Sequence, residues 1–203
     1  MGDWLVSCQT ERGTPTMPNE ILSTPTPVEQ AAHDTLIANL RNAHALEKQV
    51  IAVLEAQLKH VDEYPDLHAR LTEHVAETRE QAQRLETGLE ACGESPSVIK
   101  DTFLSMMGMS QSSVQGLSED AVLKALAADM MTEHLEIATY RSLIVLAKMA
   151  GKPELCARLE ESLREEEAMA DWFDQNLEQI TRRYVEIKAA EARPDDTKAA
   201  GRE

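Results

Sequence analysis

Four long segments of this 203-residue chain carry apolar residues at every third or fourth position, and a glutamate interrupts each series near its middle. This period indicates helices that bury one face. The interrupting residues are Glu47 and Glu77, which lie 30 residues apart, and Glu136 and Glu165, which lie 29 apart. A carboxylate on an apolar face costs several kcal/mol unless a positive charge meets it. Four such carboxylates at one level imply bound cations.

Capping residues and prolines set the expected ends of the first two helices. Thr26 is followed by a proline and then by Glu29, which combines an N-cap, a proline at the first helical position and the acid of a capping box. The first helix is therefore expected to run from there to about residue 61. Pro65 predicts the start of a second helix, and Gly93 its end, because glycine commonly follows a helix C-terminus.

The second half of the chain is predicted to hold two further helices. Ser118 is expected to cap a third helix that closes at Gly151, and Pro153 begins a fourth that extends to about residue 189. The segment 94–118 is too long for a tight turn, but it suits a crossover that runs the length of a bundle. The expected fold is therefore all-α: a four-helix bundle made of two helix pairs, with a long crossover between the second and third helices.

The two helix pairs are related as sequence repeats. PDLHARLTEHV aligns without gaps on PELCARLEESL, and the same register places Glu77 on Glu165. Counted along the helices, Glu47 and Glu77 stand 15 and 13 residues from their hairpin loop, as do Glu136 and Glu165 from theirs. At 1.5 Å per residue, all four lie about 20 Å from the loops. The four carboxylates are therefore expected to face one another.

Carboxylate oxygens are hard donors that can bridge two metal ions, and four of them nearly neutralise a pair of divalent cations. Known di-iron and di-manganese bundles use one Glu from each of two helices and a Glu-x-x-His motif from each of the other two. Here neither Glu77 nor Glu165 is followed three residues later by histidine. His74 and Gln81, each one turn from Glu77, are the nearest substitutes. The repeat equivalent of Gln81 is Met169, a poor ligand for hard ions.

The expected cofactor is a pair of iron or manganese ions, and the expected metal ligands are Glu47, Glu77, Gln81, Glu136 and Glu165. Glu133 lies one turn from Glu136 and is a second candidate on that helix. Tyr140 either hydrogen-bonds a ligand carboxylate or packs as a core tyrosine. Because Glu165, Glu166 and Glu167 are consecutive, only one or two of them can point inward. The repeat alignment selects Glu165.

Bulk properties restrict the function classes. The formal net charge of −16 argues against non-specific binding to nucleic acid or to an anionic membrane. Three widely spaced cysteines without a Cys-x-x-Cys motif indicate neither a disulfide framework nor a thiolate metal site, and no apolar run approaches a membrane span. We expect a cytoplasmic protein with a flexible leader at 1–25, a bundle at 26–189 and a polar tail at 190–203. A homodimer is left open.

Four segments resemble the signature segments of a known family, namely HALEKQV (44–50), EHVAETREQAQRLE (73–86), TEHLEIATYRSL (132–143) and LREEEAMADW (163–172). They are similar to the YciF-like branch of the ferritin-like superfamily, bacterial proteins often linked to stress, and EHLEIATY is the most specific match. The resemblance covers roughly residues 28–180. It implies a ferritin-like bundle with a dinuclear site, commonly of iron or manganese. This chain has Ala170 where these proteins often have an acidic residue.

Three functional hypotheses remain open at this point. The leading one is a ferritin-like dimetal-carboxylate protein with oxidase or peroxide-consuming chemistry in oxidative or general stress protection. The second is a non-enzymatic bundle that stores metal or uses it to support the fold. The third is an acidic module that recruits a protein partner. The lack of histidine ligands favours the second hypothesis over the first, because imidazole usually accompanies carboxylate in oxygen-activating sites. Whether the protein is an enzyme therefore stays undecided.

Overall fold

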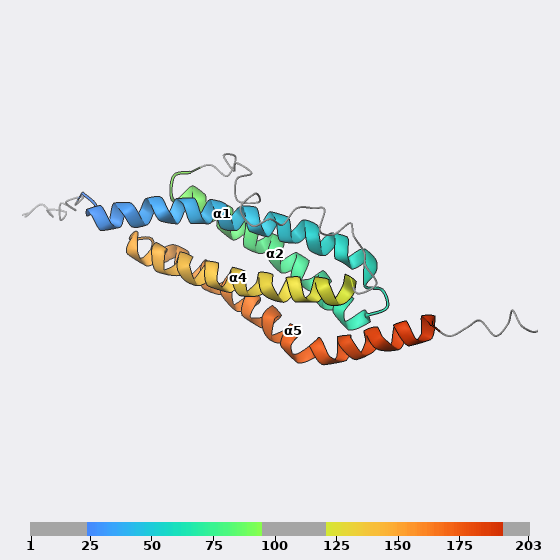
Figure 1. Ribbon diagram of the computed structural model, residues 1–203. Helices are drawn as coiled ribbons and strands as arrows, with labels where there is room; N and C mark the ends of the chain where they lie inside the picture. Colours follow the sequence, from blue (N-terminus) through green and yellow to red (C-terminus); the bar gives the residue numbers. More distant parts are fainter. Residues whose placement is uncertain (1–23, 95–120, 193–203) are drawn as a thin grey trace, which may run out of the picture.

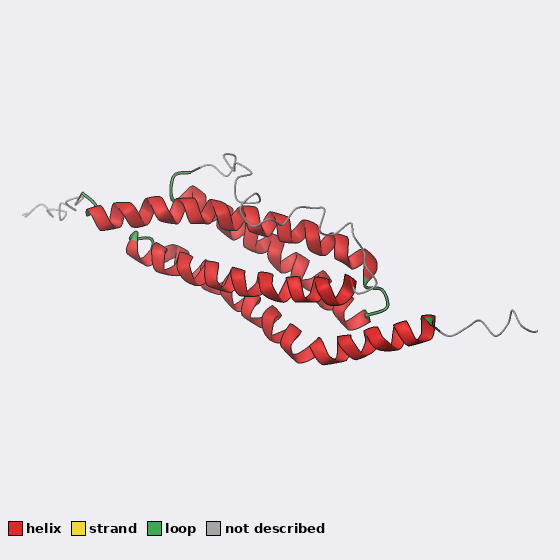
Figure 2. Ribbon diagram, in the orientation of Figure 1, coloured by secondary structure: helices red, strands yellow, loops and turns green. Residues whose placement is uncertain are grey.

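The computed structural model describes residues 24–94 and 121–192, and within these ranges every regular element is a helix. The chain forms α1 (Pro27–Gln57), α2 (Pro65–Ala91), α4 (Ala121–Met149) and α5 (Cys156–Glu191), with short 3-10 turns at Leu58–His60 and Pro153–Leu155. Figure 1 shows α1 and α2 as one hairpin and α4 and α5 as a second hairpin alongside it. Figure 2 shows only helices and loops in the described part. The predicted all-α fold of two helix pairs is confirmed.

The local signals that predicted the helix ends act as expected. The Oγ1 atom of Thr26 accepts the backbone N–H of Glu29 at 3.2 Å, and the Glu29 carboxylate accepts the backbone N–H of Thr26 at 2.7 Å. Both halves of the capping box are therefore formed. Beyond the ends of α2 and α4, Gly93 and Gly151 have φ angles of 80° and 67°. Glycine adopts these angles without the steric cost that a Cβ would add.

Some of the sequence-based expectations fall outside the described residues. Ser118 and almost all of the 94–118 crossover lie there, as do most of the proposed leader at 1–25 and of the tail at 190–203. Helix α5 ends at Glu191, two residues beyond its expected end. The domain limits stay predictions. Among the helices that the structure describes, none is both long and apolar enough to span a membrane.

The helices bury their apolar faces in two separate clusters. Helix α1 packs along α2 and α4, and α5 packs along α4 and α2. One cluster includes Leu40, Leu85, Leu143 and Leu159, and the other, nearer the loop between α1 and α2, includes Leu54, Leu71, Leu126 and Phe173. The helix segments between these clusters carry buried polar side chains in place of leucine. The candidate functional site lies in this gap between the two apolar clusters.

Candidate metal centre

A layer of buried, mostly polar side chains crosses the bundle between the two apolar clusters. Three or four residues separate neighbouring members on one helix, so each helix presents its members on a single inward face. Every member is at most 2% exposed. This inner layer consists of Glu47 from α1; His74, Thr78 and Gln81 from α2; Glu133 and Glu136 from α4; and Ser162, Glu166 and Met169 from α5.

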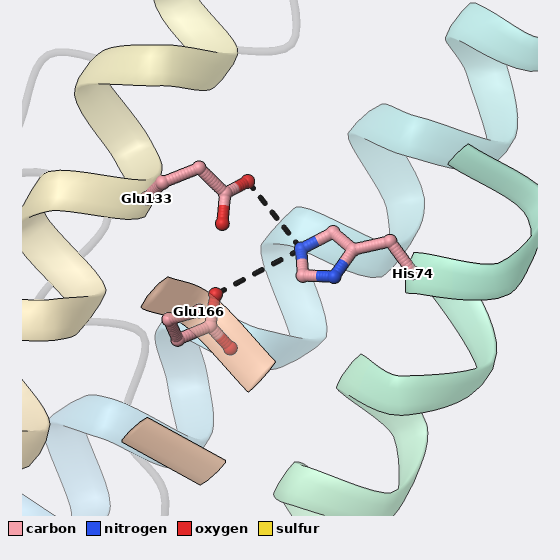
Figure 3. Close-up of side chains that lie close together, drawn as sticks. All are labelled: His74, Glu133 and Glu166. Carbon is pink, nitrogen blue, oxygen red and sulfur yellow. Dashed lines mark ion pairs between the residues drawn. The ribbon is translucent and has the colours of Figure 1, made fainter. Parts of the chain in front are cut away.

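His74 joins two carboxylates of the inner layer. Its Nε2 atom lies 3.3 Å from Oε1 of Glu133 and 3.8 Å from Oε2 of Glu166. Figure 3 shows the imidazole pointing towards both carboxylates. One donor atom from each residue lies within 4.8 Å of the other two. Donor atoms that bind one ion at about 2.1 Å stand roughly 3 to 4 Å apart, so a small closure would let all three bind a single metal ion.

Glu47 and Glu136 form the adjoining part of the inner layer. The hydroxyl of Tyr140 donates a hydrogen bond of 2.6 Å to Oε1 of Glu47. This contact corresponds to the first of the two roles expected for Tyr140, which is to hold a carboxylate of the site. Glu136 is 1% exposed, and neither of its oxygens has a hydrogen-bond partner among the residues that the structure describes. The carboxyl groups of Glu47 and Glu133 are among its neighbours and add to the cost of ionising it.

The inner layer contains buried carboxylate oxygens without hydrogen-bond partners among the described residues. They are Oε2 of Glu47, Oε2 of Glu133, and both oxygens of Glu136 and of Glu166. The amide oxygen of Gln81 is unpaired in the same way. Buried polar groups in folded proteins are nearly always paired, and an unpaired one costs about 1–3 kcal/mol, or more if it is charged. These acceptors fit bound cations, because one cation binds several hard oxygens at once.

Burial and mutual repulsion shift the pKa values in the layer. Burial raises the pKa of Glu47 to about 7, although the hydrogen bond from Tyr140 favours the ionised form. Burial, reinforced by neighbouring carboxylates, raises the pKa of Glu136 and of Glu166 well above the usual range. Burial lowers the pKa of His74, but hydrogen bonds to carboxylates outweigh it and raise the pKa to about 9. Without metal the layer therefore retains protons at neutral pH, and a cation must displace them.

Glu77 and Glu165 lie at the edge of the inner layer and pair with arginines. The Glu77 side chain is 25% exposed, and its Oε2 atom accepts from Arg70 at 2.9 Å and from Nδ1 of His74 at 3.0 Å. These hydrogen bonds, led by that from His74, hold the pKa of Glu77 below its usual range. The Glu165 side chain is 21% exposed, and Arg84 donates to both of its oxygens. Both carboxylates are thus already neutralised.

Glu47, Gln81 and Glu136 lie in the inner layer as expected, whereas Glu77 and Glu165 lie at its edge. The expectation that Glu165 rather than Glu166 faces the interior is corrected, since Glu166 is 0% exposed. Counting residues from a loop gives the height of a side chain on its helix. Successive residues point about 100° apart, so an error of one residue changes the face.

With the inward faces of α2 and α5 known, the residues that stand where dimetal bundles carry Glu-x-x-His can be named. On α2 they are Thr78 and Gln81, and on α5 they are Glu166 and Met169, all of them 0% exposed. The Thr78 hydroxyl donates to the backbone carbonyl of His74 at 2.7 Å, so it is engaged by its own helix. Only Glu166 matches the usual motif. The two sequence repeats therefore place different side chains at the equivalent positions of α2 and α5.

One buried acid close to the inner layer was missed in the apolar series. Asp129 is 6% exposed and accepts a hydrogen bond of 2.8 Å from Nε2 of Gln57. Burial raises the pKa of Asp129 to about 7. The sequence could have predicted its burial, because Asp129, Glu133 and Glu136 are at positions i, i+4 and i+7, which share one face of a helix. His74 and Glu133 appeared in the sequence only as alternatives, yet both lie in the layer.

The chain matches a described protein family over most of its length. Residues 31–186 match the family described as "Domain of unknown function (DUF892)". The chain belongs to this family. A solved protein from Xanthomonas campestris pv. campestris is 28% identical, with a TM-score of 0.66 over 78% of this chain and 99% of that one. The stress protein YciF from E. coli is 26% identical, with a TM-score of 0.58 over 71% of this chain and 92% of that one.

These similarities confirm the resemblance to the YciF-like branch of the ferritin-like superfamily. A bacterioferritin from Desulfovibrio desulfuricans, which has a diiron site, matches with a TM-score of 0.61 over 76% of this chain and 84% of that one. It is 18% identical, so this match shows a shared ferritin-like fold alone. The chemistry of this DUF892 member therefore depends on the side chains of its own inner layer.

The metal-free protein should lose stability as the pH rises from about 5 to 9. Unfolded carboxyls titrate near 4 and histidine near 6.5, whereas folded Glu47 and Asp129 titrate at about 7 and folded His74 at about 9. In each case the folded state keeps a proton that the unfolded state has lost, so the free energy of unfolding falls with rising pH. Thermal melts of chelated protein at pH 5, 7 and 9 measure this.

Replacement of single acidic residues distinguishes the titration of buried carboxyl groups from general repulsion between surface charges. Asp129→Asn should make the fall between pH 5 and 7 less steep, because a titrating group is removed while an acceptor for Gln57 is kept. Asp34→Asn, a change at an exposed acid of α1, should leave the slope unchanged. An equal effect of both variants, or a midpoint that rises with pH, would contradict the burial described above.

Proposed function

We propose that the inner layer holds two divalent metal ions, iron or manganese, and that the protein is a ferritin-like dimetal-carboxylate protein. The observation that supports this most strongly is the set of buried carboxylate oxygens without hydrogen-bond partners. The four carboxylates of Glu47, Glu133, Glu136 and Glu166 would nearly neutralise two such ions. An ion pair in this layer would therefore remove most of the cost of burying them.

The arrangement of donors suggests how the ions would be shared. His74, Glu133 and Glu166 would hold one ion, because their donor atoms converge from three helices. Glu47 and Glu136 would hold the other, with the unpaired amide oxygen of Gln81 as a further donor. Imidazole together with carboxylates suits iron and manganese, which accept both nitrogen and oxygen ligands.

The surroundings of the layer fit redox chemistry in stress protection. A bound pair of iron or manganese ions would supply electrons for the reduction of oxygen or peroxide. The chain itself would exclude water through the two apolar clusters and hold Glu47 in place through Tyr140. Similarity to a stress protein, YciF, supports a role in oxidative or general stress. On these grounds we propose oxidase or peroxide-consuming chemistry.

A non-enzymatic bundle that stores metal, or uses it to support the fold, is the second candidate. The donor set favours it, because His74 is the one imidazole in the inner layer and Met169 stands where a second Glu-x-x-His motif would place histidine. A thioether is a poor ligand for hard ions. In both candidates metal ions are the partners. A cytoplasmic location, the absence of nucleic-acid binding and a homodimer stay predictions.

Metal should raise the midpoint of thermal unfolding, because it binds the folded layer and hardly at all the unfolded chain. At a hundred times the dissociation constant the gain is about 2.7 kcal/mol. Anaerobic melts of chelated protein, with and without ferrous or manganous ion, measure it.

Glu136→Leu should abolish the gain and stabilise the chelated protein, since it replaces an unpaired buried carboxyl with an apolar side chain.

The matched control for this variant is Glu73→Leu, which changes a glutamate that is 68% exposed on α2. It should keep the full metal-dependent gain. If the gain survives Glu136→Leu as well, the metal binds outside the inner layer and the proposed centre is wrong.

Oxygen or hydrogen peroxide, added to the anaerobic ferrous protein, distinguishes the two candidate functions. A redox-active centre should give a visible absorption change and should consume the oxidant repeatedly when a reductant is present. A storage or structural site should bind the metal without turnover. Stoichiometric metal binding with no absorption change and no consumption would contradict the enzymatic function and leave the non-enzymatic one in its place.

A further inference from the structure

Glu77 and Glu165 occupy equivalent places in the two sequence repeats and share one arrangement. Each lies at the edge of the inner layer, pairs with an arginine, and accepts a hydrogen bond from a side chain of α2. The partners are Arg70 and His74 for Glu77, and Arg84 and Gln81 for Glu165. Both contacts therefore act on the polar side chains that α2 contributes to the layer.

The contact with Glu77 determines which nitrogen of His74 faces the inner layer. Nδ1 of His74 lies 3.0 Å from Oε2 of Glu77, and Arg70 donates to the same oxygen at 2.9 Å. An imidazole that donates through Nδ1 can present the lone pair of Nε2 to a metal ion. Nε2 is the atom that faces Glu133 and Glu166. The Glu77 carboxylate thus accepts the Nδ1 proton, and Nε2 is left as the atom whose proton a metal ion would displace.

The contact with Glu165 determines the orientation of the Gln81 amide. Nε2 of Gln81 donates a hydrogen bond of 3.0 Å to Oε2 of Glu165. The amide oxygen therefore lies on the other side of the group, where it is buried and has no hydrogen-bond partner in the described ranges 24–94 and 121–192. A buried amide oxygen without a donor is a hard ligand available to a cation. Glu165 itself is held by Arg84, which donates to both of its oxygens.

We propose that Glu77 and Glu165 are matched positioning residues, which present one nitrogen and one oxygen of α2 to the metal centre. Glu77 fixes Nε2 of His74 inward, and Glu165 fixes Oε1 of Gln81 inward. The two metal positions consequently differ in their ligands, although the frame that surrounds them is repeated. This inference rests on the proposed metal centre and assigns the two edge glutamates a role outside its ligand set.

The arginine contacts explain why these two carboxylates act from outside. A metal ion that bound Glu165 directly would have to displace Arg84, whose guanidinium contacts both oxygens. At Glu77 the contacts with Arg70 and His74 both fall on Oε2, so a metal ion that took this oxygen would break the contact that orients His74. The nearby guanidinium charges also repel a cation. The edge glutamates are thus held as hydrogen-bond acceptors, whereas no arginine among the described residues contacts the inner ones.

Both glutamates accept hydrogen bonds from side chains of α2, because the equivalent positions of α5 hold no side-chain N–H group. In the repeat alignment the equivalents of His74 and Gln81 on α5 are Ser162 and Met169. A thioether has no N–H group that a carboxylate could hold. Glu77 therefore acts on a residue three positions earlier in its own helix, and Glu165 reaches across from α5 to α2.

Cobalt(II) titrations followed by visible absorption test the role of Glu77, because they report both affinity and ligand geometry. Glu77→Ala should weaken cobalt(II) binding at the His74 position by about 10 to 100-fold. Glu77→Gln should keep most of the affinity, since an amide oxygen can still accept from Nδ1 and from Arg70. The control is Glu73→Ala. Glu73 also contacts Arg70, at 3.4 Å, but it is 68% exposed, and the change should have no effect.

The same design applies to Glu165 at the other metal position. Glu165→Ala should weaken cobalt(II) binding there to a similar degree, and Glu165→Gln should restore most of it. Glu161→Ala is the control, because Glu161 also contacts Arg84, at 3.4 Å, but is 53% exposed. Each alanine variant should change the absorption of one cobalt position and leave the other unchanged, which a general loss of stability would not produce.

Double variants show whether each glutamate acts through its α2 partner. In a His74→Ala background, Glu77→Ala should cause no further loss of cobalt(II) affinity, and Glu165→Ala should cause none in a Gln81→Ala background. Additive losses of cobalt(II) affinity, or glutamine variants that bind cobalt(II) as weakly as the alanine variants, would indicate that the glutamates are themselves ligands and would overturn the inference. Unchanged affinity in both alanine variants would also overturn it. A wild-type protein that binds no cobalt(II) would instead refute the metal centre itself.

Discussion

The structure depends on the cost of burying ionisable carboxyl groups in the middle of a helical bundle. Glu47, Glu136 and Glu166 are fully buried between two apolar clusters, at positions where leucine would complete the packing. Desolvation raises their pKa values, so the metal-free layer compensates with protons. On the proposed account, metal ions replace those protons. The layer then changes from a destabilising element of the fold into a stabilising one.

Electrostatic partners divide the glutamates into two groups with different roles. Glu77 and Glu165 are neutralised by arginines at the edge of the layer, where each holds an α2 side chain in one orientation. Within the part of the chain that the structure describes, the inner glutamates contact no arginine, and most of their oxygens have no hydrogen-bond partner. A ferritin-like fold by itself does not determine function. The proposed activity therefore rests on this separation of the arginine-paired carboxylates from the inner ones, within a family described only as a domain of unknown function.

The helix ends and the bundle could be predicted from the sequence because their signals are local. Thr26 and Gly93 act within a single turn of helix. The inward face of α5 could not be predicted in the same way. The rotation of a long helix is set by all of its buried side chains, including Met169 and Phe173, and these place Glu166 inward. His74 remained only an alternative because it does not fit the Glu-x-x-His spacing.

Anomalous diffraction from metal-free crystals soaked in manganous ion would show whether the inner layer binds metal. We expect two anomalous peaks in the inner layer, one bounded by His74, Glu133 and Glu166 and the other beside Glu47 and Glu136. Ordered manganese found only at exposed acidic residues, with no peak in the inner layer, would contradict the proposed metal centre.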